Sequence, residues 1–101
     1  NEYQNFQRRF LMDQWTPKVV EIKLCEAMQM NIDLAIADGW LQWLSSRDRK
    51  LVVMRSQNIP WKIIARKQSM DTTTAWRHYK RSISKICRRL QAIDDDIAIL
   101  L

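Results

Sequence analysis

Apolar residues recur at helical spacing along most of the chain, and polar or proline residues interrupt them between stretches. The first clear stretch starts at Thr16-Pro17. Thr is a favoured N-cap, and Pro suits the first helical position because its missing N–H needs no partner there. We predict a helix from this point to about Met30. Its inward positions are Val20, Leu24, Ala27 and Met28.

A second helix follows, and Asn31 or Asp33 is its expected N-cap. Gly39 lies in the middle of this helix, where it costs roughly 1 kcal/mol of helix propensity relative to Ala. We expect its absent side chain to let another helix or a Trp approach closely. The apolar face comprises Leu34, Ala37, Leu41 and Leu44, with Trp40 and Trp43 beside it.

Three further helices are predicted in the second half of the chain, over 47–56, 60–67 and 72–90. Ser45-Ser46 cap the first of them and Asp71 is a strong N-cap for the last. The inward residues of the helix over 47–56 are Leu51, Val52 and Met54, and those of the helix over 60–67 are Trp61, Ile64 and Ala65. The inward residues of the helix over 72–90 are Ala75, Tyr79, Ile83, Ile86 and Leu90.

Residues 59–86 have the spacing of a helix-turn-helix. A helix of two turns carries the small residue Ala65 where the next helix would cross it closely, and Ala75 packs there from the second helix. Met70 is the apolar residue of the turn between them. In such a motif the second helix enters the major groove of duplex DNA, which is about 12 Å wide.

The composition supports an all-α fold, a small bundle of about five helices with this C-terminal helix-turn-helix. One Gly and two Pro in 101 residues leave almost no residues for β-hairpin turns. We predict one domain over 1–101, in which 1–45 is a helical support and 46–90 the basic helix-turn-helix. Residues 1–14 are either a short docking helix or an arm without function. The acidic and then apolar tail, 91–101, either docks on the N-terminal half or contacts another copy.

Positive charge is concentrated in one part of the chain. The whole chain has a net charge of +6, but residues 47–89 contain thirteen Lys or Arg and only two acids. Such asymmetry indicates a polyanionic partner for the basic half, and double-stranded DNA fits the predicted motif.

The positions that would face DNA follow from the inward ones. Thr72, Thr73, Trp76 and Arg77 lie near the start of the last helix and are the candidate base-reading residues. Arg77 is suited to a guanine edge and the Thr methyl groups to thymine, whereas Trp76 either lies on sugar or thymine methyls or folds into the core. The candidate phosphate-binding residues are Arg55, Lys62, Arg66, Lys67, Lys80, Arg81 and Lys85.

Other kinds of site have little support in the sequence. Cys25, Cys87 and His78 are too few for a structural zinc site, and we interpret both thiols as free in a reducing compartment. Asp94-Asp95-Asp96 is interpreted as a solvated acidic patch. No nucleophile triad, Gly-rich phosphate loop or paired carboxylates in an apolar setting are present, so we expect neither an enzyme nor a cofactor. No apolar run of about 18 residues occurs, so we expect a cytoplasmic protein that is not a membrane protein.

Several blocks of residues resemble a known family. They are Trp15-Thr16-Pro17-x-Val19-Val20-Glu21, Ala35-x-x-x-Gly39-Trp40-Leu41-x-Trp43-Leu44, Asp48-Arg49-Lys50-Leu51-Val52, Trp61-Lys62-x-Ile64-Ala65 and Thr74-Ala75-x-Arg77. The pattern is similar to small phage and prophage proteins of alphaproteobacteria whose C-terminal half is similar to sigma-factor region 4. Those proteins often have Gly in the turn, where this chain has Ser69. The resemblance implies a DNA-binding, nucleoid-associated regulator of phage-derived genes, with RNA polymerase as a further candidate partner.

Three function classes follow. The first is a sequence-specific transcriptional regulator, which is the prediction. The second is a DNA-packaging protein, such as a small terminase-like subunit, or an architectural protein, which would use the same motif within an oligomer. The third is a sigma-like module that binds a protein and does not read DNA.

Overall fold

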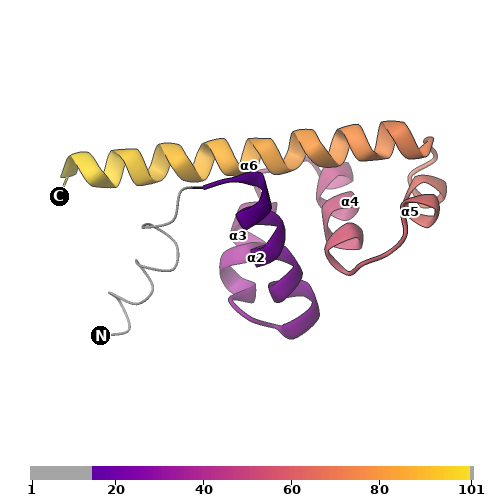
Figure 1. Ribbon diagram of the computed structural model, residues 1–101, viewed down its shortest axis with the longest axis horizontal. Coiled ribbons are helices and arrows are strands. Elements are labelled where there is room, and N and C mark those ends of the chain that lie inside the picture. The colour runs from indigo at the N-terminus through magenta and orange to yellow at the C-terminus, as the bar shows by residue number, and fades with distance from the viewer. Residues whose placement is uncertain (1–14, 101) are drawn as a thin grey trace.

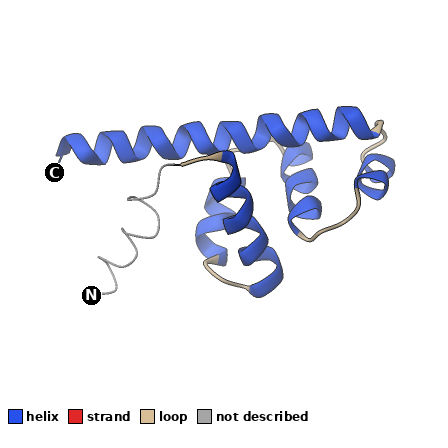
Figure 2. Ribbon diagram, viewed as in Figure 1, coloured by secondary structure: helices blue, strands red, loops and turns tan. Residues whose placement is uncertain are grey.

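The computed structural model describes residues 15–100, and all the regular structure within that range is α-helical (Figures 1 and 2). The predicted all-α fold is confirmed. The helices are α2 (Pro17–Met30), α3 (Leu34–Leu41), α4 (Ser46–Ser56), α5 (Trp61–Lys67) and α6 (Thr72–Leu100). The question of a helix or an arm at 1–14 concerns residues outside the described part of the chain.

Three predicted N-caps form the expected hydrogen bonds. The Thr16 hydroxyl accepts from the Val19 N–H at 3.2 Å, and the Ser45 hydroxyl accepts from the Asp48 N–H at 3.2 Å. Asp71 Oδ1 accepts from the Thr74 N–H at 2.6 Å. The sequence therefore set these helix starts locally, by satisfying a backbone donor that has no partner inside the helix.

The region around the second helix agrees with the prediction at its N-cap and differs from it at two other positions. Of the two predicted N-caps, Asp33 occupies the N-cap position of α3, without a side-chain capping bond, whereas Asn31 ends α2 with a left-handed backbone, φ 56°. Leu34 is 36% exposed, so the buried face of α3 begins at Ala37. A Cβ built on Gly39 would meet nothing within 4 Å, so the expected close approach there is wrong.

Helices α4 and α5 end in the same way. Asn58 and Ser69 adopt left-handed φ angles of 64° and 55°. The next N–H in each case returns to a helix carbonyl: Ile59 N donates to Met54 O at 3.1 Å, and Met70 N donates to Ala65 O at 3.0 Å. These are Schellman motifs, which satisfy carbonyls that the helix end would otherwise leave unpaired. Ile59 and Met70 then pack against the core, half-buried.

Helix α6 sets the shape of the molecule. Its 29 residues span about 43 Å at 1.5 Å per residue, close to the 46 Å long axis of the molecule. Figure 1 shows α2, α4 and α5 beneath its first two thirds, while its C-terminal end projects past them. The prediction that this helix ends near residue 90 is wrong: residues 91–100 continue α6 without a break.

The core lies between α6 and the helices beneath it. The inward positions predicted for the last helix, Ala75, Tyr79, Ile83, Ile86 and Leu90, are all buried. Leu24 of α2, Leu51 of α4 and Ile64 of α5 are fully buried against this row. One amphipathic face of α6 thus holds three other helices in place.

Trp15 ties the start of the described chain to α6. Its indole is 8% exposed and lies edge-on to Trp40, with ring centroids 5.5 Å apart. The indole N–H donates to Asp94 Oδ2 at 2.5 Å, and the Cys87 thiol donates to the Trp15 carbonyl at 3.0 Å. The chain entering α2 is therefore anchored against the far half of α6.

Candidate nucleic-acid interface

Helices α5 and α6 are joined by the turn 68–71 and pack directly on each other (Figure 1). The contact uses the expected residues: Ile64 and Ala65 on α5 and Ala75 on α6 are all buried. Small side chains at the crossing let the two backbones approach. The turn is further held by Arg47, whose guanidinium donates to the Gln68 carbonyl at 3.2 Å.

The first turns of α6 present the four candidate base-reading residues to solvent. Thr72, Thr73 and Arg77 are exposed, and Trp76 is 47% exposed. Trp76 therefore lies at the surface and does not fold into the core. The side chains that alternate with them, Ala75 and Tyr79, point inward. The start of the helix thus has an exposed polar and aromatic face opposite a buried apolar one.

Asp71 is anionic at the start of this face. Hydrogen bonds from Thr74, first from its backbone N–H, hold the pKa of the Asp71 carboxyl below its usual range, and the Arg77 charge lowers it further. The carboxylate therefore stays ionised at neutral pH as the N-cap of α6.

Four of the seven candidate phosphate-binding residues extend freely into solvent. Lys62, Arg66, Lys67 and Lys85 are exposed, and within the described chain no hydrogen bond or ion pair engages their side chains. The first three lie on α5, beside the start of α6. They place exposed positive charge where a polyanion could approach both helices.

The other three candidate phosphate-binding residues have partners in the protein. Arg55 is half-buried, donates to the Ile59 carbonyl at 3.1 Å and lies 4.9 Å from the Trp61 ring centroid. Lys80 pairs with Glu21 at 3.7 Å and lies 5.6 Å from the Trp76 ring. Arg81 donates to His78 Nδ1 at 2.7 Å. These contacts orient each cation, and they compete with a phosphate for it.

His78 is half-buried on α6. Its Nδ1 also lies 3.6 Å from Asp48 Oδ1. The His78 ring thus contacts both Asp48 on α4 and Arg81 on its own helix.

Trp61 is a candidate site residue that the sequence placed only in the core. It is half-buried, and its ring is edge-on to Tyr79 with centroids 5.3 Å apart. It also borders a shallow hollow of about 440 Å³, which we call the Trp hollow and which is lined by Trp61, Thr72, Thr73 and Trp76. The signal in the sequence was an aromatic residue at the first position of α5, directly after Pro60.

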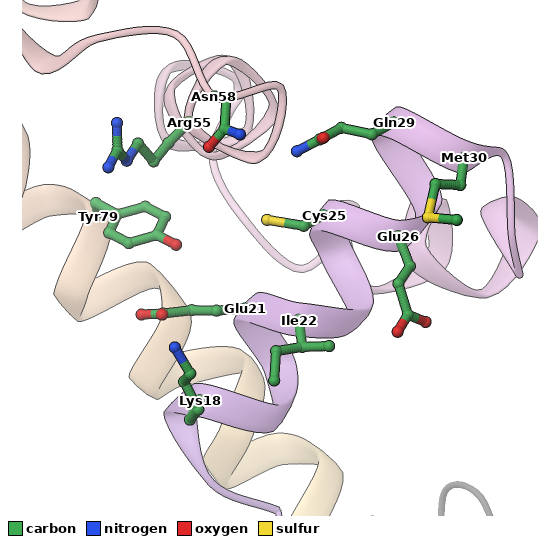
Figure 3. A pocket seen from close by; sticks show the side chains of 10 residues that line it. All are labelled: Lys18, Glu21, Ile22, Cys25, Glu26, Gln29, Met30, Arg55, Asn58 and Tyr79. Carbon is green, nitrogen blue, oxygen red and sulfur yellow. The ribbon is translucent and has the colours of Figure 1, made fainter.

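A second hollow, of about 400 Å³, lies between α2, the end of α4 and α6. The Tyr79 hydroxyl and the Cys25 thiol face the same space there, with the Glu21 carboxylate beside them (Figure 3). Burial raises the pKa of both groups, and the Glu21 charge raises it further. Both groups are therefore protonated at neutral pH, and this hollow offers no activated nucleophile.

Both cysteines are free thiols. Cys25 is half-buried and Cys87 is buried, where its pKa is raised by desolvation. Among the described residues, no three His, Cys, Asp or Glu side chains gather as metal ligands would. Nor is any helix in the described range long and apolar enough to cross a membrane.

Comparison with known proteins identifies a family. The model of a domain of unknown function, DUF6362, matches residues 12–86, which include α2 to α5 and the first half of α6. No curated protein and no solved structure matches the chain. Since the matched residues make up most of its length, the chain belongs to the DUF6362 family.

Proposed function

We propose that residues 46–90 act as a helix-turn-helix that binds duplex DNA and that the chain regulates transcription of phage or phage-derived genes. One observation carries the proposal. At the start of α6 the side chains of Thr72, Thr73, Trp76 and Arg77 are exposed, while α5 packs across the opposite, buried face. A helix held in this way can present its first turns to a groove.

The charges around that face support DNA over an uncharged partner. Lys62, Arg66 and Lys67 lie exposed on α5, and Lys85 lies further along α6. Cations in these positions would contact phosphates and fix the position of the protein along the duplex, while Arg77 and the threonines contact base edges. Arg55, Lys80 and Arg81 already have protein partners. We therefore propose that their main role is to hold the interface residues in place.

The test is selection from random genomic duplex fragments, followed by a salt titration of the bound fragments. Each phosphate neutralised contributes about −0.9 to the slope of log K against log salt. A regulator enriches particular fragments and has a steep slope. A steep slope without enrichment contradicts sequence-specific reading and favours packaging or architecture. Absence of binding at ~150 mM salt contradicts DNA binding altogether and favours a protein partner, such as RNA polymerase.

One observation favours the second candidate, a packaging or architectural protein. The projecting end of α6 exposes Ile93, Ile99 and Leu100, with exposed fractions of 39%, 82% and 85%. A packaging protein of this kind works as an oligomer, and such a face is suited to a contact between copies. The mass of the protein in solution separates the candidates, because a ring requires many copies and a regulator one or two.

A further inference from the structure

The Trp hollow is an apolar depression on the face that we assign to DNA. Its walls are the two indoles, Trp61 and Trp76, and its remaining lining is Thr72 and Thr73. The hollow lies where the start of α5 meets the start of α6. An apolar group of a ligand would cover the exposed part of these indoles favourably.

Both indoles are held in place by neighbouring side chains. Trp61 contacts two neighbours: the Arg55 guanidinium lies 4.9 Å from its ring centroid and the Tyr79 ring centroid 5.3 Å away. Trp76 has the Lys80 ammonium 5.6 Å from its ring, and Glu21 pairs with that ammonium. The walls are therefore positioned before any ligand arrives, which reduces the ordering cost of binding.

The surrounding charge identifies the kind of ligand. Lys62, Arg66 and Arg77 are exposed cations on the two helices that form the hollow. An apolar pocket with cations around it fits a polyanion that carries an apolar group on its surface. In the major groove of DNA that group is the 5-methyl of thymine, since thymine alone of the four bases carries a methyl group there.

We propose that the Trp hollow is the specificity subsite of this interface and that it takes the 5-methyl group of a thymine. This inference rests on the proposed function. Trp76 contacts the methyl group with its exposed ring, and the methyl groups of Thr72 and Thr73 complete the apolar lining. The Thr hydroxyls remain available for the polar edges of neighbouring bases.

The experiment removes one methyl group at a time from the DNA. The probe is a duplex enriched in the genomic selection, synthesised with each thymine replaced in turn by deoxyuridine, which keeps the base pair and lacks only the methyl. At one or two positions we expect binding to weaken by about fourfold, the effect of losing one buried methyl group. Replacement at the other thymines is the internal control and is expected to leave affinity unchanged.

Two protein variants connect that effect to the hollow. Trp76→Ala should bind the duplex with the same affinity whether the sensitive position holds thymine or deoxyuridine. The deoxyuridine replacement and the Trp76→Ala substitution together should then weaken binding no more than Trp76→Ala alone. Trp76 is half exposed, so its removal leaves the core intact. Thr73→Ser removes only a methyl from the lining and is expected to reduce the response without removing it.

The outcomes separate the inference from the function on which it rests. If the protein binds the duplex and no thymine responds to loss of its methyl, the subsite is wrong and DNA binding stands. If a thymine responds equally in Trp76→Ala and in the original protein, the methyl is read elsewhere and the subsite is again wrong. If no duplex is bound, the proposed function fails, and the subsite fails with it.

Discussion

Two exposed cations of α6, Arg77 and Lys85, lie in different surroundings, and we expect them to contact different parts of DNA. Arg77 is exposed beside Thr73 and Trp76, whereas Lys85 lies two turns further along the helix. A guanidinium can bind a guanine edge in two places, and an ammonium on a mobile stem acts as a point charge. Their contributions should therefore differ in kind as well as in size.

Arg77→Ala is expected to relax specificity at one base pair, with a loss of about 1–3 kcal/mol for the preferred base only. Lys85→Ala is expected to weaken binding to all sequences alike and to lower the salt slope by about one. Affinities for the selected duplex and for single-base variants of it measure both effects. Equal losses on every sequence for both variants would contradict the base-reading role of Arg77.

At the scale of elements, the two Schellman motifs determine how α4, α5 and α6 follow each other. Each requires a residue with a left-handed backbone, and the chain uses Asn58 in one and Ser69 in the other. Asn tolerates that conformation better than most residues, while Ser pays a steric cost for its Cβ. The turn between α5 and α6 therefore holds strain that the sequence pattern alone did not require.

Ser69→Gly is expected to raise the free energy of unfolding by about 0.5–1 kcal/mol, because glycine adopts a positive φ without the steric cost but loses more entropy on folding. Urea denaturation followed by circular dichroism measures the change. Ser46→Gly is the matched control: Ser46 lies at the start of α4 with helical geometry, so there glycine should destabilise. A loss of stability in Ser69→Gly would contradict the assigned strain.

At the scale of the whole molecule, α6 connects parts of the chain that are distant in sequence. Trp15 and Asp94 are joined by a hydrogen bond across 79 positions. Beyond this bond, α6 continues without another described helix beneath it (Figure 1). The bond and the projecting end are each open to a direct test.

Asp94→Asn is expected to raise Tm at neutral pH. Burial raises the pKa of the Asp94 carboxyl and Asp95 raises it further, against a lowering by the Trp15 indole. Because the folded pKa lies above the unfolded one, the native state loses stability as pH rises through it. Asn is uncharged and still accepts from the indole.

The advantage of Asp94→Asn should shrink as pH falls below the ordinary Asp pKa of about 3.9. Thermal melts between neutral and acid pH measure it, with the exposed Asp96→Asn as control. If Asp94→Asn melts below the original protein at neutral pH, the charge-assisted bond to Trp15 outweighs the burial of the carboxylate, and the expected sign is wrong.

The projecting end of α6 is expected to join two copies of the chain. The buried row at Ile83, Ile86 and Leu90 continues at Ile93 and Ile97 with alternating spacings of three and four residues, the repeat of a helix seam. Light scattering should report a dimer for the original chain and a monomer for Ile93→Lys. Ala92→Lys adds the same charge on a neighbouring face and should stay dimeric. A monomeric original chain would remove this contact.

Much of the fold was predictable because the signals are local. Thr16-Pro17, Ser45 and Asp71 start helices through bonds within four residues, and the inward set of α6 follows from the helical repeat. The errors occurred where local signals are weak. In residues 91–100 the helical spacing continues at Ile93 and Ile97, but three acidic residues interrupt it. Asn31 fits a helix start as well as a helix end.

Of the candidate site, the sequence alone determined which residues have the right chemistry and helical phase: Thr72, Thr73, Trp76 and Arg77 share a face because spacing on a helix is fixed by its geometry. Only the tertiary structure decided that Trp76 faces solvent and that Trp61 of another helix shares a hollow with it. It also decided that Arg55, Lys80 and Arg81 have protein partners. Spacing within one helix is a local property, whereas a contact between helices depends on how their buried faces pack together.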